Sequence, residues 1–218
     1  YGSIWYGDEL WNNGAMKDYD GDGIYDDYDG LMWDDEANQS RGFKTWTPFT
    51  HPQLGEVEIG GFHPKFFGQN GPTWQLEDWA KKQALFNLAM AKRLPQLEVN
   101  DLNVRKLPSG EFEITLEWTN TGKLPVALEQ AKLVKIVQED RVSLDFDKEL
   151  TKGYENAKVK ITTPSLYDKT IYAGYTEVGE KKTATFKVKV DGNEAVKGKI
   201  KLSSTRGGYF EREFILNQ

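Results

Sequence analysis

The chain has 218 residues and a formal net charge of -6 at neutral pH, so its length suits one large or two ordinary domains of about 100 to 150 residues each. The negative charge argues against nucleic acid as a partner, because phosphate binding needs a concentrated basic surface. The lack of cysteine excludes disulfides and thiolate chemistry, and no apolar run approaches the roughly 20 residues that span a bilayer.

Two parts of the chain differ in composition. Six of the seven tryptophans precede residue 80, whereas the later part alternates Lys, Thr, Val and Glu. We expect two domains, over residues 1–95 and 96–218. Residues 2–6 are aromatic and β-branched and predict a strand. Because the chain starts with Tyr1 rather than Met and this strand follows at once, we expect it to be a processed or truncated part of a longer protein.

The next segment, Asp18-Tyr19-Asp20-Gly21-Asp22-Gly23-Ile24-Tyr25-Asp26-Asp27-Tyr28-Asp29, has the spacing of an EF-hand calcium loop. Such a loop takes ligands from positions 1, 3, 5, 7, 9 and 12 and has glycine at position 6. Counted from its first residue, the predicted calcium ligands are Asp18, Asp20, Asp22, the carbonyl of Ile24, Asp26 and Asp29. A divalent cation would relieve the repulsion among these carboxylates.

The alternative is a solvated acidic loop, because runs of like charge are usually exposed. Asp29 stands where the full motif has a bidentate Glu, and the sequence predicts no helices on either side of the loop. The segment therefore resembles the calcium loops of dockerin or thrombospondin type 3 repeats more than a sensor hand. We expect a structural role, in which calcium holds a long surface loop.

Residues 44–50 and 55–60 follow as extended segments bounded by Pro and Gly. Thr73 is then a predicted N-cap, and a helix is expected from Trp74 to Leu94, where Pro95 ends it. Apolar residues of this helix fall on one broad arc, which predicts a helix packed on a core.

From Leu97 onward the hydrophobic period changes to two. In residues 111–119, the side chains of Phe112, Ile114, Leu116 and Trp118 share one face, and similar alternation recurs at 184–190 and 200–202. Short strands of this kind, separated by turns, predict an all-β antiparallel sandwich of about seven strands.

Few residues are suited to catalysis. The two histidines, His51 and His63, each precede proline and lack a companion zinc-ligand pair, so turn roles are the simpler interpretation. Glu9 lies at the end of the first predicted strand among aromatic residues, where it suits a general base; a surface or capping acid is the alternative.

Residues 2–11, Gly-Ser-Ile-Trp-Tyr-Gly-Asp-Glu-Leu-Trp, resemble the segment that carries the catalytic glutamate in zinc carboxypeptidases of the M14 (carboxypeptidase A-like, funnelin) family. Residues 51–62, His-Pro-Gln-Leu-Gly-Glu-Val-Glu-Ile-Gly-Gly-Phe, and the helix at 74–94 resemble the segments that come after this glutamate in bacterial members. The resemblance implies an α+β chain: the C-terminal fragment of an α/β peptidase domain (strand, calcium-type loop, long helix), followed by the sandwich as an accessory domain.

The resemblance also implies the chemistry. Glu9 would be the general base and acid of a zinc-dependent hydrolysis of C-terminal peptide bonds, acting on a peptide or protein substrate. The zinc ligands lie upstream in the family, so this chain alone is expected to be inactive. An extracellular or periplasmic location is expected. The acidic insertion at 12–44 departs from the short connection that is usual in the family.

Two other functions compete with the peptidase interpretation. One is a non-catalytic, calcium-stabilised adhesion or carbohydrate-binding module, in which Trp33 and Trp46 would stack on sugars. The other is a structural domain that braces a neighbouring one.

Overall fold

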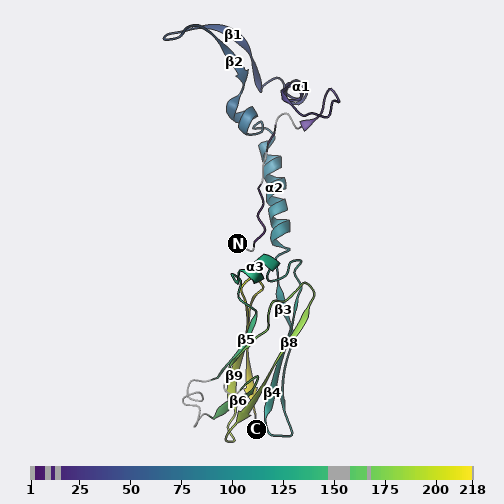
Figure 1. Ribbon diagram of the computed structural model, residues 1–218, viewed down its shortest axis with the longest axis vertical. Helices are drawn as coiled ribbons and strands as arrows, with labels where there is room; N and C mark the ends of the chain where they lie inside the picture. The colour runs from purple at the N-terminus through teal and green to yellow at the C-terminus, as the bar shows by residue number, and fades with distance from the viewer. Residues whose placement is uncertain (1–2, 8–10, 13–15, 147–157, 166–167, 218) are drawn as a thin grey trace. The chain divides into compact units, whose positions relative to one another are not determined.

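A computed structural model describes residues 3–7, 11–12, 16–146, 158–165 and 168–217 (Figure 1). Glu9 lies outside these residues. The chain divides into two compact units, one of Trp5–Leu88 and the other of Tyr1–Ile4 with Ala89–Gln218.

The unit Trp5–Leu88 contains helices and one hairpin. Its elements are helix α1 (Asp27–Ala37), strands β1 (Phe43–His51) and β2 (Gly55–Phe62), a short π-helical turn η2 (Pro64–Gln69) and most of helix α2 (Leu76–Ala91). Strands β1 and β2 pair antiparallel, which confirms the two extended segments. The strand expected over residues 2–6 is not formed in the described part, 3–7. Its composition favours an extended backbone, but a strand also needs a neighbour to accept its hydrogen bonds.

Helix α1 corrects the expectation that no helix flanks the acidic loop. Asp26 is its N-cap: the side chain accepts hydrogen bonds from the N–H groups of Tyr28 and Asp29, at 2.8 and 3.5 Å. The Asp29 side chain in turn accepts from the N–H of Asp26, which completes a capping box. The Asp26-x-x-Asp29 spacing is thus a helix-start signal inside the acidic run.

A cluster of aromatic rings forms the centre of this unit. Trp33 and Phe67 are buried, and their ring centroids lie 6.1 Å apart. The rings of Trp11 and Trp79 stand 5.1 Å apart, and Trp11 lies 5.3 Å from Trp33. Phe62, at the end of β2, stacks on Phe67. These contacts hold α1, the hairpin and the start of α2 together.

Helix α2 is shorter than predicted, and none of its residues is buried. Glu77 and Asp78 lie in its first turn, as expected, where negative charge suits the helix dipole. Of its apolar arc, Trp79 packs against Trp11 in the aromatic cluster and the Phe86 ring lies 6.1 Å from that of Tyr6, but Leu76, Phe86 and Leu88 are still exposed. The predicted packing on a core is therefore present only at the start of the helix, because periodicity shows which face of a helix is apolar and not whether the chain supplies a partner for it.

The second unit is the predicted antiparallel sandwich, and its described residues form eight strands in two sheets. One sheet has the order β3-β4-β8-β6 and the other β10-β9-β5-β7. The strands are β3 (Leu97–Lys106), β4 (Phe112–Asn120), β5 (Arg141–Phe146), β6 (Val159–Thr163), β7 (Thr170–Tyr172), β8 (Lys181–Val190), β9 (Val196–Ser204) and β10 (Gly208–Leu216), with one short helix α3 (Glu129–Leu133).

Alternation along the strands places the sandwich core between the sheets. Phe112, Ile114, Leu116 and Trp118 are all buried, as the period of two predicts. They share one cluster with buried residues of β5, β6, β8, β9 and β10. Gly198 permits this packing, since a Cβ there would lie 2.4 Å from the Phe214 ring.

Polar groups at one end of the sandwich are buried as a chain of hydrogen bonds. The Trp118 indole donates to the Thr176 hydroxyl at 3.1 Å, and that hydroxyl donates to the Asp140 carboxylate at 2.5 Å. Asn120, also buried, donates to the Leu124 carbonyl. The helices in the described part of the chain are too short or too polar to cross a membrane.

Candidate metal site

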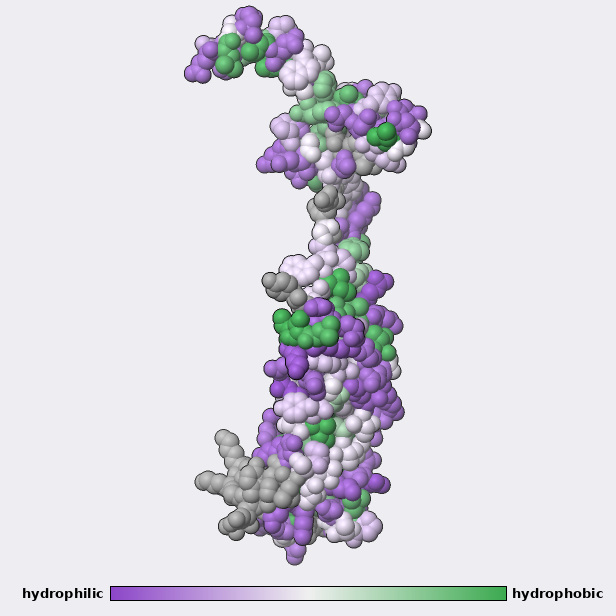
Figure 2. Space-filling model, viewed as in Figure 1, coloured by the Kyte–Doolittle hydropathy of each residue, from purple (hydrophilic) through white to green (hydrophobic). Residues whose placement is uncertain are grey.

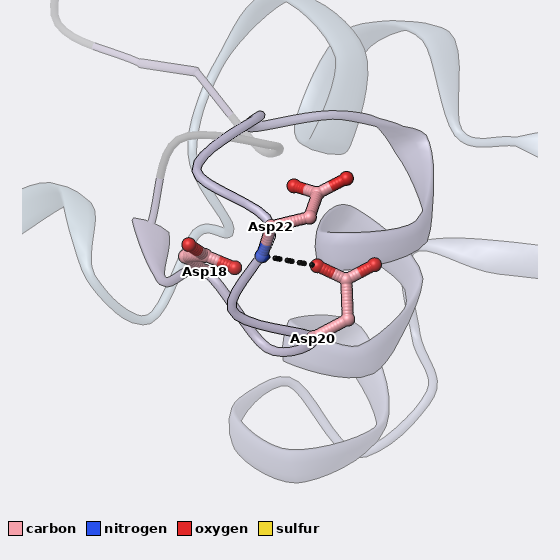
Figure 3. Close-up of side chains that lie close together, drawn as sticks. All are labelled: Asp18, Asp20 and Asp22. Atoms are coloured by element: carbon pink, nitrogen blue, oxygen red, sulfur yellow. Dashed lines mark hydrogen bonds between the residues drawn. The ribbon is translucent and has the colours of Figure 1, made fainter.

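Three of the predicted ligands lie together at the start of the acidic loop. Oxygen atoms of Asp18, Asp20 and Asp22 all fall within 4.8 Å of one another (Figure 3). Asp18 is half-buried, whereas Asp20 and Asp22 are exposed. The carboxylates therefore converge while their outer side stays open to water, which a hydrated cation could use for entry.

The backbone of the loop curls around these side chains. Gly21 and Gly23 have φ values of 76° and 81°, a region that glycine enters without steric cost. Asp18 accepts hydrogen bonds from the N–H groups of both glycines, at 2.6 and 3.0 Å. Glycine at the sixth loop position, Gly23, thus lets the chain fold back onto the first ligand.

The carboxylates of Asp20 and Asp22 each accept a hydrogen bond from the backbone N–H of the residue two positions later. Asp20 accepts from the N–H of Asp22 at 3.2 Å, drawn as the dashed line in Figure 3, and Asp22 accepts from the N–H of Ile24 at 2.7 Å. Each uses one oxygen in this way. The remaining carboxylate oxygens are available to a cation.

The last two predicted ligands serve the helix start. The Asp26 side chain is the N-cap of α1, and the Asp29 side chain is buried. One oxygen of Asp29 accepts from the N–H of Tyr19 at 2.7 Å, and the other from the N–H of Asp26 at 3.2 Å. The structure therefore groups three of the five carboxylates; Asp26, Asp29 and the carbonyl of Ile24 stay predictions as ligands.

Helix α1 also holds the entry to the loop. Glu36 accepts hydrogen bonds from the Tyr19 hydroxyl and from the Lys17 ammonium, the latter at 3.2 Å. Burial and the neighbouring carboxylates of Glu36 and Asp29 raise the pKa of Tyr19 to about 12. The same two hydrogen bonds, followed by the charge of Lys17, lower the pKa of Glu36. Both ends of the loop are thus fixed to one helix.

Repulsion among the carboxylates affects the pKa of the exposed middle one, Asp20. The N–H of Asp22 lowers the pKa of Asp20, but partial desolvation and the charges of Asp22, Asp29 and Asp18 outweigh it, so the pKa of Asp20 is raised overall. A bound cation would reverse this balance, because it favours the ionised form. The donor set is all oxygen, which suits a hard cation such as calcium rather than zinc.

The histidines occupy turns, as expected. His51 ends β1, and its Nδ1 accepts from the N–H groups of Gln53 and Leu54, both at 3.2 Å. His63 is the N-cap of η2 and accepts through Nδ1 from Lys65 and Phe66. Among the described residues, neither histidine belongs to a group that could hold a metal.

Of the two tryptophans considered for sugar stacking, only one is accessible. Trp33 is 6% exposed and lies inside the aromatic cluster, so its role as a binding platform is wrong. Trp46 is 55% exposed, and its ring lies over Gly61, where a Cβ would approach the ring to 3.2 Å.

Sequence reasoning missed a buried acid in the same unit. Asp34 accepts from the Asn38 amide and the Gly42 N–H, each at 2.7 Å, and from the Phe43 N–H at 3.1 Å. It joins the end of α1 to the start of β1. Its place in an acidic run gave no hint of burial, because only the tertiary fold supplies three donors.

A family model matches the second part of the chain. The sequence model of a family described as a domain of unknown function (DUF8731) matches residues 96–215, which covers all eight strands of the sandwich. A search of curated proteins finds no match to the chain.

Proposed function

The chain belongs to the DUF8731 family, whose domain it contains at residues 96–215, and we propose that it is the C-terminal portion of a zinc-dependent metallocarboxypeptidase. On this proposal Trp5–Leu88 belongs to the end of the peptidase domain and the sandwich is its accessory domain. The support from sequence is the resemblance of residues 2–11 and 51–62 to the M14 peptidases.

The observation that carries the proposal is an uncovered apolar surface on the smaller unit. A two-stranded hairpin is at best marginally stable alone in water. Here one face of the hairpin is apolar, since Phe49 pairs with Val57 and Thr47 with Ile59, while Glu58 and Glu56 lie on the other. Figure 2 shows green residues at the surface of this hairpin.

Helix α2 carries a second group of exposed apolar residues. The exposed large apolar residues of these two elements are Trp46, Phe49, Ile59, Leu76, Leu85, Phe86 and Leu88. Groups of exposed large apolar residues mark candidate interaction sites. The rest of an α/β peptidase domain, packed on the arc of α2 and on the hairpin, is the cover that we propose.

Glu9 is the residue to which we assign the chemistry. It would accept a proton from the attacking water and deliver it to the leaving amine of the C-terminal residue. The zinc, held by residues outside this chain, would act as a Lewis acid and lower the pKa of that water. The calcium loop begins nine residues after Glu9, at Asp18, and we assign it the role of holding this connection in place.

An extracellular or periplasmic location accords with this role. Calcium modules that act outside cells bind calcium with dissociation constants of about 0.1 to 1 mM, whereas cytosolic sites must bind far more tightly. The loop lacks the bidentate Glu of tight EF-hands, so we propose that it works at the higher concentrations.

The test is a peptidase assay on the longer polypeptide that includes the residues preceding Tyr1. Release of C-terminal amino acids from a peptide should fall at least about 100-fold in Glu9→Gln, because general base catalysis contributes about that much or more. Glu58→Gln, on the exposed polar side of the hairpin, is the matched control and should retain full activity. Equal activity of both variants would overturn the assignment of Glu9.

The second candidate is a non-catalytic, calcium-stabilised adhesion or carbohydrate-binding module. The exposed indole of Trp46 favours it, because aromatic faces stack on sugars. In that case Trp46→Ala would abolish glycan binding while leaving the calcium loop intact. Unchanged glycan binding in this variant would remove the candidate.

A further inference from the structure

A small pocket lies in the unit Trp5–Leu88, just beyond the end of α1. Its volume is about 300 Å³, and it is lined by Ala37, Gln39, Arg41 and Trp74. Ligand pockets begin at about this size, which accommodates one sugar ring rather than a large molecule. None of these side chains belongs to the metal site or to the chemistry assigned to Glu9.

One wall of the pocket is a tryptophan held in a fixed position. The Trp74 indole N–H donates to the Asn38 side chain at 2.9 Å, and Asn38 is buried and donates in turn to Asp34. Trp74 is nevertheless 53% exposed. A ring that is oriented by a buried network but left open to solvent is prepared to stack on a ligand, because little freedom remains to be lost on binding.

A second wall carries backbone strain. Gln39 and Ser40 have φ values of 59° and 54°, and both lie in the left-handed region just after the end of α1. Glycine is the usual residue at such a position, since a side chain there costs about 1 kcal/mol or more. Glycine at position 39 would relieve this strain, but the chain has Gln39 there, whose side-chain amide lines the pocket. Backbone strain of this kind concentrates at functional sites.

Arg41 lines the third side of the pocket and carries a positive charge. The Arg41 N–H donates to the Asn38 carbonyl at 3.3 Å, which ties its backbone to the same network. Within the described ranges of the chain, the guanidinium of Arg41 forms no ion pair with an Asp or Glu. A guanidinium with no internal partner can bind a carboxylate through two parallel hydrogen bonds.

From these three walls we propose that the pocket binds a hexuronic acid, a sugar whose ring carries a carboxylate. The sugar face stacks on Trp74, the carboxylate pairs with Arg41, and the Gln39 amide donates to or accepts from a hydroxyl. The three side chains match the apolar face, the charge and the hydroxyls of such a sugar. The proposal is independent of the peptidase assignment, since it uses neither Glu9 nor zinc.

The test is a titration of the 218-residue chain with methyl glucuronide, followed through the tryptophan indole N–H signals in NMR spectra. We expect the Trp74 signal to shift and saturate with methyl glucuronide, and the neutral methyl glucoside to bind about tenfold more weakly, because it lacks the charged hydrogen bond. Arg41→Gln should remove this difference between the two sugars. Equal binding of both sugars to the unaltered chain, or no binding of either, would overturn the proposal.

A second variant separates binding from folding. Gln39→Gly should raise the midpoint of thermal unfolding, because it relieves the strained φ, yet weaken glucuronide binding several-fold. Tyr172→Ala, which removes an exposed aromatic ring of the sandwich, is the control and should bind like the unaltered chain. If Gln39→Gly bound glucuronide as well as the unaltered chain, or if Tyr172→Ala lost binding, the pocket would not be the site.

Discussion

Removal of one carboxylate from the acidic loop should separate calcium binding from folding. In the unaltered chain the Asp22 carboxylate accepts a hydrogen bond from the Ile24 N–H at 2.7 Å. Asp22→Asn keeps an oxygen that can accept this bond but removes one negative charge from the cluster. The variant should therefore fold without calcium at least as well as the unaltered chain, because the repulsion that raises the pKa of Asp20 is reduced. It should bind calcium at least about tenfold more weakly, since it loses a charged ligand.

The magnitude comes from linkage between binding and folding. A ligand present at 100 times its dissociation constant stabilises the folded state by about 2.7 kcal/mol. For a unit of the size of Trp5–Leu88, each kcal/mol moves the unfolding midpoint by about 4 to 8 °C. Saturating calcium should thus raise the midpoint of this unit by about 10 to 20 °C over its value in chelator.

The assay can be directed mainly at this unit. Six of the seven tryptophans, with the cluster of Trp11, Trp33 and Trp79, lie within it, so near-ultraviolet circular dichroism during heating reports chiefly its unfolding. Calorimetric titration supplies the dissociation constant. If chelator and calcium gave the same midpoint, or if Asp22→Asn bound calcium like the unaltered chain, the ligand assignment would be refuted.

Three further predictions concern pH, the sandwich core and catalysis. In chelator, the raised pKa of Asp20 means that its contribution to stability is present at low pH and is lost as pH rises through that pKa, whereas the lowered pKa of Glu36 acts in the opposite sense. The unfolding midpoint of the unaltered chain should therefore fall relative to that of Asp20→Asn as the pH rises, and a difference between the two that does not change with pH would contradict this. Thr176→Val should lower the free energy of unfolding in urea by about 2 to 3 kcal/mol, because it leaves the Trp118 N–H without its acceptor and takes a donor from Asp140. The control Thr205→Val, at an exposed site, should lower it little, and equal losses in both variants would refute the prediction. The 218-residue chain alone, assayed with added zinc, should release no C-terminal amino acid, and chelator-sensitive release would show that the chain holds its own zinc site.

The sandwich was predictable because its signal is local. Alternation in residues 111–119 and 184–190 identifies the inward face of each strand, and the structure buries those side chains between the sheets. The order of the strands was not predictable, since pairing such as that of β5 with β9 joins segments distant in the chain.

The metal site was predictable in part for the same reason. Ligand spacing and Gly23 lie within one short segment, and the structure brings Asp18, Asp20 and Asp22 together. The acidic pattern alone could not distinguish a metal ligand from a helix cap, the role that Asp26 has in the structure. A capping box uses the same residue types as a calcium loop.

Other features depend on contacts that no local pattern encodes. The burial of Asp34 requires donors from Asn38, Gly42 and Phe43, which meet only when α1 and β1 are in place. The apolar arc of α2 was visible in the sequence, but its exposure was not, because periodicity does not reveal whether a partner lies within the chain.

The zinc content of the longer polypeptide that includes the residues preceding Tyr1 tests the central claim most directly. Elemental analysis after dialysis should find one zinc per longer chain and none on the 218-residue chain, since the zinc ligands are proposed to lie upstream of Glu9. A longer polypeptide that retains no zinc would contradict the account, as would stoichiometric zinc on the 218-residue chain alone.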